Sequence, residues 1–298
     1  MHPTEVHAMS SSHVQTTTTM IPARDGYPLS AVVRQPLGTP KAVLQLHSGT
    51  GIPQALYGKF AHFLAEQGYA TITFDYRGIG GSKPATLKGF SARLQDWAQL
   101  DMAGVLDWAC ATYPDQKKII IAHSMGGQLI GLMENHTQID RIIMIASSTG
   151  YWRDMSSPFR WLMPPVWFVV IPLSTVLFGY ANAELLKQGE NLPKDVALQW
   201  RRWCTNPAYF SEDMGTLIRP VFFTEVRSPI TMFRITDDPI ANAITAPKLL
   251  AYYPNTPQEL RVIAPQDVGV DRIGHAGFFS GKFRDTLWHE CLRTVEQG

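Results

Sequence analysis

The sequence has little cysteine and few charged side chains, and each shortage excludes a class of protein. The 298 residues include three cysteines, Cys110, Cys204 and Cys291, which are an odd number, far apart and without a CxxC pair. Neither a disulfide framework nor a zinc ribbon is therefore expected. Charged residues make up 17% of the chain, Lys plus Arg number 26 against 25 Asp plus Glu, and no long basic run occurs. A nucleic-acid partner is not expected.

Signals for export, metals and cofactors are also missing from the sequence. The first twenty residues lack the basic start, apolar stretch and small-residue cleavage site of a secretory signal. Together with the cysteine content, this predicts a cytoplasmic protein. No HExxH motif or clustered His, Cys and Asp set occurs, so no metal and no cofactor is expected.

One apolar run is long enough to cross a bilayer. Residues 161–183 carry no charge, but Pro164, Pro165 and Pro172 interrupt them. We therefore expect no stable membrane span, and we expect a pair of lid helices that are buried or face the substrate.

Hydrophobic residues make up 45% of the sequence, enough for a large core, and strand-like and helix-like segments alternate along it. Alternation of this kind predicts an α/β fold with a mostly parallel sheet flanked by helices. We expect a flexible N-terminal tail at residues 1–18, a core formed by 19–150 and 229–298, and a helical cap at 151–228. The predicted strands cover residues 27–35, 41–47, 70–74, 118–122, 141–146, 230–235 and 260–264, and the predicted helices 60–67, 91–113, 126–136 and 279–295.

A candidate nucleophile follows the apolar strand at 118–122. Ser124 stands at the predicted strand-to-helix turn, in the pattern A-x-S-x-G formed with Ala122 and Gly126. A turn this tight needs small residues two positions to either side, because larger side chains would collide with the strand and the helix. The serine hydroxyl would then lie at the carboxyl edge of the sheet, near the positive end of the following helix.

A serine nucleophile needs a base, normally a histidine held by a carboxylate. Asp237 and Asp238 follow the strand at 230–235, and His275 lies between the last strand and the closing helix. The chain order of serine, acid and histidine is the one typical of the α/β-hydrolase arrangement. Asp238 is preferred because it precedes a proline, and Asp237 remains open. His47 and His123 are expected to be structural, with His47 bonded to the backbone.

An acyl-transfer reaction also needs two N–H groups that stabilise the oxyanion. The N–H of Met125, directly after the serine, is the first candidate. The second would come from the glycine-containing loop after residue 47, where Gly49 and Thr50 are the candidates. Which of these two amides faces the oxyanion is left open.

The chain resembles the α/β-hydrolase superfamily over nearly its whole length, and in particular a bacterial group of predicted serine hydrolases. The resemblance rests on SGTGIPQALY, FDYRGIGGS, AHSMGG, NLPKDVALQWRRWC, TDDPIA and RIGHAGFF. It implies that Ser124, Asp238 and His275 form a catalytic triad and that esters or lactones are hydrolysed. It also implies a structural turn, with no catalytic role, at Asp75, Arg77, Gly78 and Gly80. A serine nucleophile argues against dehalogenase and epoxide hydrolase chemistry, which uses an aspartate.

The predicted cap indicates the kind of substrate. It holds five of the eight tryptophans of the chain: Trp152, Trp161, Trp167, Trp200 and Trp203. Such aromatic density favours an apolar pocket. We therefore expect a serine hydrolase that cleaves a small-molecule carboxylic ester or lactone with an apolar acyl arm. An amidase or peptidase is the nearest alternative, a non-catalytic binding protein on the same fold is another, and a homodimer is left open.

Overall fold

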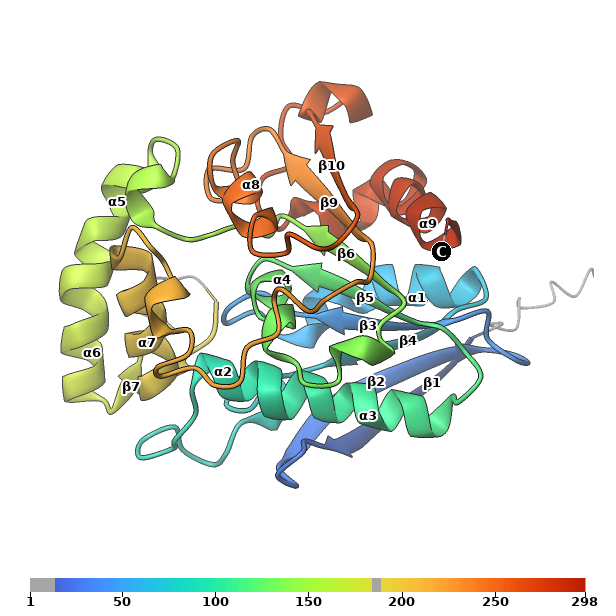
Figure 1. Cartoon of the computed structure of the whole chain (residues 1–298), viewed down its shortest axis with the longest axis horizontal. Helices are drawn as coiled ribbons and strands as arrows, with labels where there is room; N and C mark the ends of the chain where they lie inside the picture. The colour runs from blue at the N-terminus through green and yellow to red at the C-terminus, as the bar shows by residue number, and fades with distance from the viewer. Residues whose placement is uncertain (1–13, 184–188, 298) are drawn as a thin grey trace, which may run out of the picture.

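The computed structural model describes residues 14–183 and 189–297, and an eight-stranded sheet runs through its centre (Figure 1). The strand order is β1-β2-β4-β3-β5-β6-β9-β10. The strands are β1 (Val14–Pro22), β2 (Pro28–Pro36), β3 (Val43–His47), β4 (Ala70–Phe74), β5 (Lys118–His123), β6 (Arg141–Ile145), β9 (Ile230–Ile235) and β10 (Gln258–Ile263). β2 pairs antiparallel with both β1 and β4, and the strands β4, β3, β5, β6, β9 and β10 pair in parallel in that order.

The central strands β3, β4 and β5 are buried along their whole length because helices cover both faces of the sheet. Successive residues of β5 alternate between two separate cores, with Ile119 and Ile121 in one and Ile120 and Ala122 in the other. The first core is closed by α1 (Gly58–Glu66) and α9 (His289–Glu296), and the second by α3 (Ala103–Thr112) and α8 (Thr245–Leu250). The register of β5 is therefore fixed on both sides of the sheet.

The predicted strands from 27–35 onward are all confirmed within two residues at each end. The tail prediction is wrong for residues 14–18, which belong to β1. The run of threonines in β1 is exposed and gives no hydrophobic alternation, but it pairs along its whole length with β2. Residues 1–13 of the predicted tail lie outside the described residues.

Three helix predictions need correction. The predicted helix at 126–136 shrinks to α4 (Met125–Gln128) followed by short helical turns, because Gly126, Gly127 and Gly131 leave few residues that favour a helix. The helix predicted at 91–113 starts later, as α2 (Leu94–Asp96), and continues through a wider turn at Trp97–Met102 into α3. The helix predicted at 279–295 has α9 as its last part, after irregular turns.

Residues 146–229, the inserted segment, join β6 to β9. They contain α5 (Phe159–Pro165), α6 (Ile171–Leu177), the short strands β7 (Tyr180–Ala181) and β8 (Leu192–Pro193), and α7 (Lys194–Thr205). These helices gather at one side of the sheet, at the left of Figure 1.

The apolar run in the inserted segment forms one helix over Phe159–Leu177, long and apolar enough by composition to cross a membrane. Only 22% of its most apolar window is buried. The expectation of buried helices is therefore wrong for most of this surface, and the alternative, that the helices face the substrate, stays a prediction.

Candidate active site

Ser124 lies at a strained turn between β5 and α4. Its φ of 50° and ψ of −116° place a non-glycine residue in a backbone region that L side chains rarely adopt. Its N–H donates to the carbonyl of Ile145 on the neighbouring strand β6, at 3.1 Å. The turn is thus held by the sheet itself, and the serine side chain remains partly exposed.

The glycines after the serine are required by close packing. A Cβ on Gly126 would lie 2.7 Å from the carbonyl oxygen of His47, and a Cβ on Gly127 would lie 2.3 Å from Oγ of Ser147. His47 is the last residue of β3 and Ser147 follows β6, the two strands that flank β5, so the start of α4 packs between two strand ends. The small residue that the sequence pattern placed at position 126 is explained by this contact.

The three side chains that the sequence placed together form a continuous hydrogen-bonded chain. Oγ of Ser124 lies 2.9 Å from Nε2 of His275, and Nδ1 of His275 lies 2.7 Å from Oδ2 of Asp238. The Asp238 side chain is fully buried, while that of His275 is 21% exposed. Because the carboxylate accepts at Nδ1, the neutral imidazole carries its proton there and presents Nε2 to the serine as an acceptor.

Asp238 is held in place by the main chain as well. Its Oδ1 accepts from the N–H groups of Ile240 and Ala241, at 2.8 and 3.1 Å. Burial alone would raise the pKa of this carboxyl, but the charge and hydrogen bond of His275 and the two N–H donors outweigh it and lower the pKa. Asp238 is therefore ionised and can stabilise a protonated imidazole.

Asp237, the alternative acid, has a different role. Its carboxylate accepts from the N–H groups of Ile273 and Gly274, at 3.0 Å each. These bonds tie the loop that carries His275 to the loop that carries Asp238. The two adjacent acids thus have different roles: Asp238 contacts the imidazole of His275, and Asp237 holds the loop that carries His275.

The candidate oxyanion donors are not equivalent. Met125 is the first residue of α4, so its N–H has no acceptor within the helix. Gly49 differs from the prediction, because its N–H donates to the hydroxyl of Tyr57 at 3.0 Å and so already has an acceptor. The loop still lies beside the site, since a Cβ on Gly49 would be 3.2 Å from Nδ1 of His123. Thr50 is the remaining candidate from this loop.

A buried hydrogen-bond chain, which the sequence did not indicate, supports His275 from behind. Nε2 of His123 lies 3.0 Å from the main-chain carbonyl of His275, which can only accept, so Nε2 carries the proton. Nδ1 of His123 then accepts from the hydroxyl of Tyr57, at 2.8 Å. The chain therefore runs from the Gly49 amide through Tyr57 and His123 to the backbone of His275. Burial lowers the pKa of His123 to about 3, which keeps this imidazole neutral.

Two further sequence expectations concern structural residues. His47 is buried and interacts with the backbone of Gly126, as expected, and its Nε2 also contacts the side-chain amide of Gln45, at 2.9 Å. Asp75 accepts from the main-chain N–H groups of Gln54 and Gly81, at 2.7 and 2.9 Å. Such contacts suit the structural turn that the resemblance implies. Among the described residues, no group of three or more His, Cys, Asp or Glu side chains could hold a metal ion.

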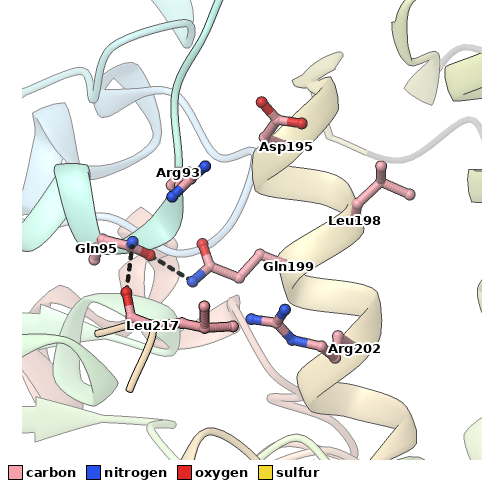
Figure 2. A pocket seen from close by; sticks show the side chains of 7 residues that line it. All are labelled: Arg93, Gln95, Asp195, Leu198, Gln199, Arg202 and Leu217. Carbon is pink, nitrogen blue, oxygen red and sulfur yellow. Dashed lines mark hydrogen bonds between the residues drawn. The ribbon is translucent and has the colours of Figure 1, made fainter. Parts of the chain in front are cut away.

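A cavity of about 240 Å³ lies apart from the serine, where α7 packs against α2 (Figure 2). Within it, Gln199 donates to Gln95 and accepts from the N–H of Leu94, at 2.8 Å for the latter. None of Ser124, His275 and Asp238 lines the cavity, which lies where the inserted segment packs against the core. Its lining consists of Arg93, Gln95, Asp195, Leu198, Gln199, Arg202 and Leu217.

Comparison with known proteins places this geometry in context. Residues 38–198 match the model of the family described as serine aminopeptidase, S33. Three solved structures are similar over nearly the whole chain: the Pyrococcus furiosus esterase Pf2001, a thermostable carboxyl esterase from Bacillus coagulans, and a soluble variant of monoglyceride lipase from Saccharomyces cerevisiae.

The similarity lies in the fold more than in the sequence. Identity is 17% to the Pyrococcus esterase, 13% to the Bacillus esterase and 15% to the yeast lipase, with TM-scores of 0.62, 0.63 and 0.65. The alignments cover 99%, 95% and 100% of this chain, and 97%, 98% and 98% of the other chains. The α/β-hydrolase fold expected from the sequence is confirmed.

Proposed function

Because the chain belongs to the serine aminopeptidase (S33) family of α/β-hydrolases, we propose that it is a serine hydrolase that cleaves a carboxylic ester or lactone through a covalent acyl-enzyme. The observation that carries the proposal is the hydrogen-bonded chain from Asp238 through His275 to Ser124. Serine, imidazole and carboxylate in this arrangement are the groups that acyl transfer requires.

The proposed reaction uses each group in turn. Oγ of Ser124 attacks the substrate carbonyl carbon while Nε2 of His275 takes the hydroxyl proton, and the ionised Asp238 stabilises the imidazolium. The N–H groups of Met125 and Thr50 stabilise the oxyanion. The imidazolium then protonates the leaving alkoxide, which leaves an acyl-serine. Water, deprotonated by the same histidine, attacks that ester, and the imidazolium returns the proton to Oγ of Ser124 as the bond to the serine breaks and the acid is released.

An apolar acyl arm is supported by the composition of the inserted segment and by the names of the similar structures. Trp167 and Trp203 are fully buried and form the core of this segment, while Trp152 and Trp200 are half-buried at its edge. Two of the similar structures are esterases and one is a monoglyceride lipase. We propose that the inserted segment acts as a cap that receives the apolar arm and excludes water.

The family name also raises the peptidase alternative. An aminopeptidase needs an acidic group that binds the free amino group of its substrate. Glu190, an acidic residue of the inserted segment that lies against Gly51, is already paired with Lys83 at 2.7 Å and with the N–H of Gly80 at 2.8 Å. This pairing favours an ester or lactone over an aminoacyl amide.

The test is hydrolysis of a series of p-nitrophenyl esters of increasing acyl length, beside aminoacyl p-nitroanilides and aliphatic lactones. We expect ester or lactone turnover that prefers apolar acyl groups, and kcat lower by about 10⁵ to 10⁶ in Ser124→Ala. A fluorophosphonate probe should label the wild type and not this variant. An intact wild type that neither labels nor turns over any ester or lactone would favour a non-catalytic binding protein, and turnover of anilides alone would favour a peptidase.

A further inference from the structure

The helix at Phe159–Leu177, here called the outer helix, has apolar side chains on both its buried and its exposed sides. Towards the protein, Trp167 and Ile171 are buried together with Ser174 and Thr175, one or two turns apart. Towards solvent lie Trp161, Leu162, Phe168, Val169, Leu173, Val176 and Leu177, all between 51% and 79% exposed. So many adjacent exposed apolar side chains are unusual for a monomer surface and mark an interaction site.

The buried side of the outer helix is fixed to the protein. The ring of Trp167 meets that of Trp200 edge-on at 4.9 Å, and Arg201 donates to the carbonyl of Trp167. The hydroxyl of Ser174 donates to the carbonyl of Tyr180, at 3.0 Å. These contacts hold the helix in one rotation and leave its remaining apolar side chains towards solvent. α5 and α6 lie at the outer margin of the molecule in Figure 1.

Two arginines, Arg160 and Arg201, border the exposed side of the outer helix. Between Asp154 and Glu184 the one charged residue in the sequence is Arg160, and Asp154 is itself paired with Lys248 at 2.6 Å. Arg160 lies over the ring of Trp161 at 5.6 Å, and Arg201 lies over that of Phe168 at 5.7 Å. An apolar strip with aromatic rings and arginines at its edges matches the boundary between anionic headgroups and acyl chains.

The alternatives fit these observations less well. A protein partner would be expected to exchange hydrogen bonds across an interface of this size, and the exposed side chains of the strip offer few donors or acceptors. A membrane span would require the buried side, including the Trp167 and Ser174 contacts, to leave the protein.

We propose that the outer helix is an interfacial anchor that lies flat on an anionic phospholipid surface, with its exposed apolar side chains inserted at the headgroup level. The basic edge strengthens binding through the negative surface potential. This inference does not depend on the proposed hydrolysis, because the outer helix contains none of Ser124, Asp238 and His275.

The test is co-sedimentation of the full chain with phosphatidylcholine vesicles containing or lacking phosphatidylglycerol. We expect binding to the anionic vesicles that weakens with added salt and is weaker on the neutral ones. The double variant Leu173→Ser, Val176→Ser should bind at least about tenfold more weakly, because two exposed apolar side chains no longer insert. The matched control is Leu37→Ser, which changes a side chain that is 71% exposed at the turn after β2 and should bind like the wild type.

Ser124→Ala should bind the vesicles as the wild type does, so a failure of the proposed chemistry leaves this result unchanged. The melting temperatures of the double variant Leu173→Ser, Val176→Ser and of the control Leu37→Ser should match that of the wild type, since the changed side chains are exposed. Absence of vesicle binding, or equal binding by the double variant, would overturn the proposal. Two other results would also overturn it: a dimer in solution that the double variant abolishes without vesicle binding, and membrane association that resists alkaline carbonate.

Discussion

Nε2 of His123 donates to the main-chain carbonyl of His275 at 3.0 Å. The residue directly before Ser124 therefore holds the backbone of the histidine whose side chain contacts Ser124. The same imidazole accepts from Tyr57, whose hydroxyl accepts from the amide of Gly49. The turn that carries the serine, the loop that carries the histidine and the loop after β3 are therefore linked by buried hydrogen bonds.

Tyr57→Phe tests this link. The change leaves Nδ1 of His123 and the N–H of Gly49 buried without partners, so we expect the free energy of unfolding to fall by about 1–3 kcal/mol. Urea unfolding measures the loss. The control is Tyr69→Phe, which removes the same atom from a buried ring whose hydroxyl makes no hydrogen bond within residues 14–183 and 189–297, and should change stability by less than about 0.5 kcal/mol. Equal losses in the two variants would show that the link contributes nothing.

His123 predicts a pH dependence of stability. Its pKa is depressed to about 3 in the folded state by burial, against an ordinary value of 6.5. Below pH 6.5 the unfolded chain takes up a proton that the folded chain refuses, so stability is full above pH 6.5 and is lost as the pH falls towards 3. By pH 5 the loss from this group is about 2 kcal/mol.

The measurement is the unfolding free energy of the wild type and of His123→Gln at pH 8 and at pH 5. Other titrating groups contribute to both proteins and cancel in the difference. The variant should gain about 2 kcal/mol relative to the wild type on going from pH 8 to pH 5. Parallel pH profiles would mean that the pKa of His123 is the same in the folded and unfolded states.

Substitution of Asp238 should lower kcat far more than substitution of Asp237. Asp238→Asn can no longer stabilise the imidazolium and can favour the wrong tautomer of His275, so kcat should fall by about 10⁴. Asp237→Asn keeps the imidazole contact and weakens two N–H bonds to the His275 loop, so its effect on kcat should be far smaller. Ester hydrolysis at saturating substrate measures both, and the reverse order would transfer the acid role to Asp237.

Gly126→Ala should damage stability and activity together. The new Cβ would approach the main-chain oxygen of His47 to 2.7 Å, and a backbone atom between two strands cannot move away easily. We expect a loss of about 1–3 kcal/mol or more in unfolding free energy. Gly281→Ala is the control, since its nearest neighbour is the side chain of Lys59 at 3.8 Å and its φ is not positive. A structure of Gly126→Ala with an unshifted turn would contradict the expectation.

The sequence predicted the parallel sheet well because its central strands are short apolar runs, each followed by a helical pattern. It could also bring Ser124, Asp238 and His275 together, since each follows a strand whose end lies at the same edge of the sheet. β1 escaped prediction because an edge strand of exposed threonines has no apolar face. The Tyr57 link escaped it because a contact between residues 66 positions apart leaves no local signal, although His123 stands directly before the serine.

The solvent-facing side of the outer helix could not be read from the sequence either. An uncharged run predicts burial, and whether the burying surface belongs to the same chain depends on packing. Here Trp167 and Ser174 determine the rotation of the helix, and the remaining apolar residues are left outside.

The position of β5 in the sheet has a consequence for how activity would be lost. Four strands separate it from one edge and three from the other. Fraying that starts at β1 or β10 must cross those strands before it disturbs the turn at Ser124. We therefore expect the amide protons of β5 to be among the last to exchange with deuterium, and nicking of the terminal strand by a protease to leave the nucleophile in place.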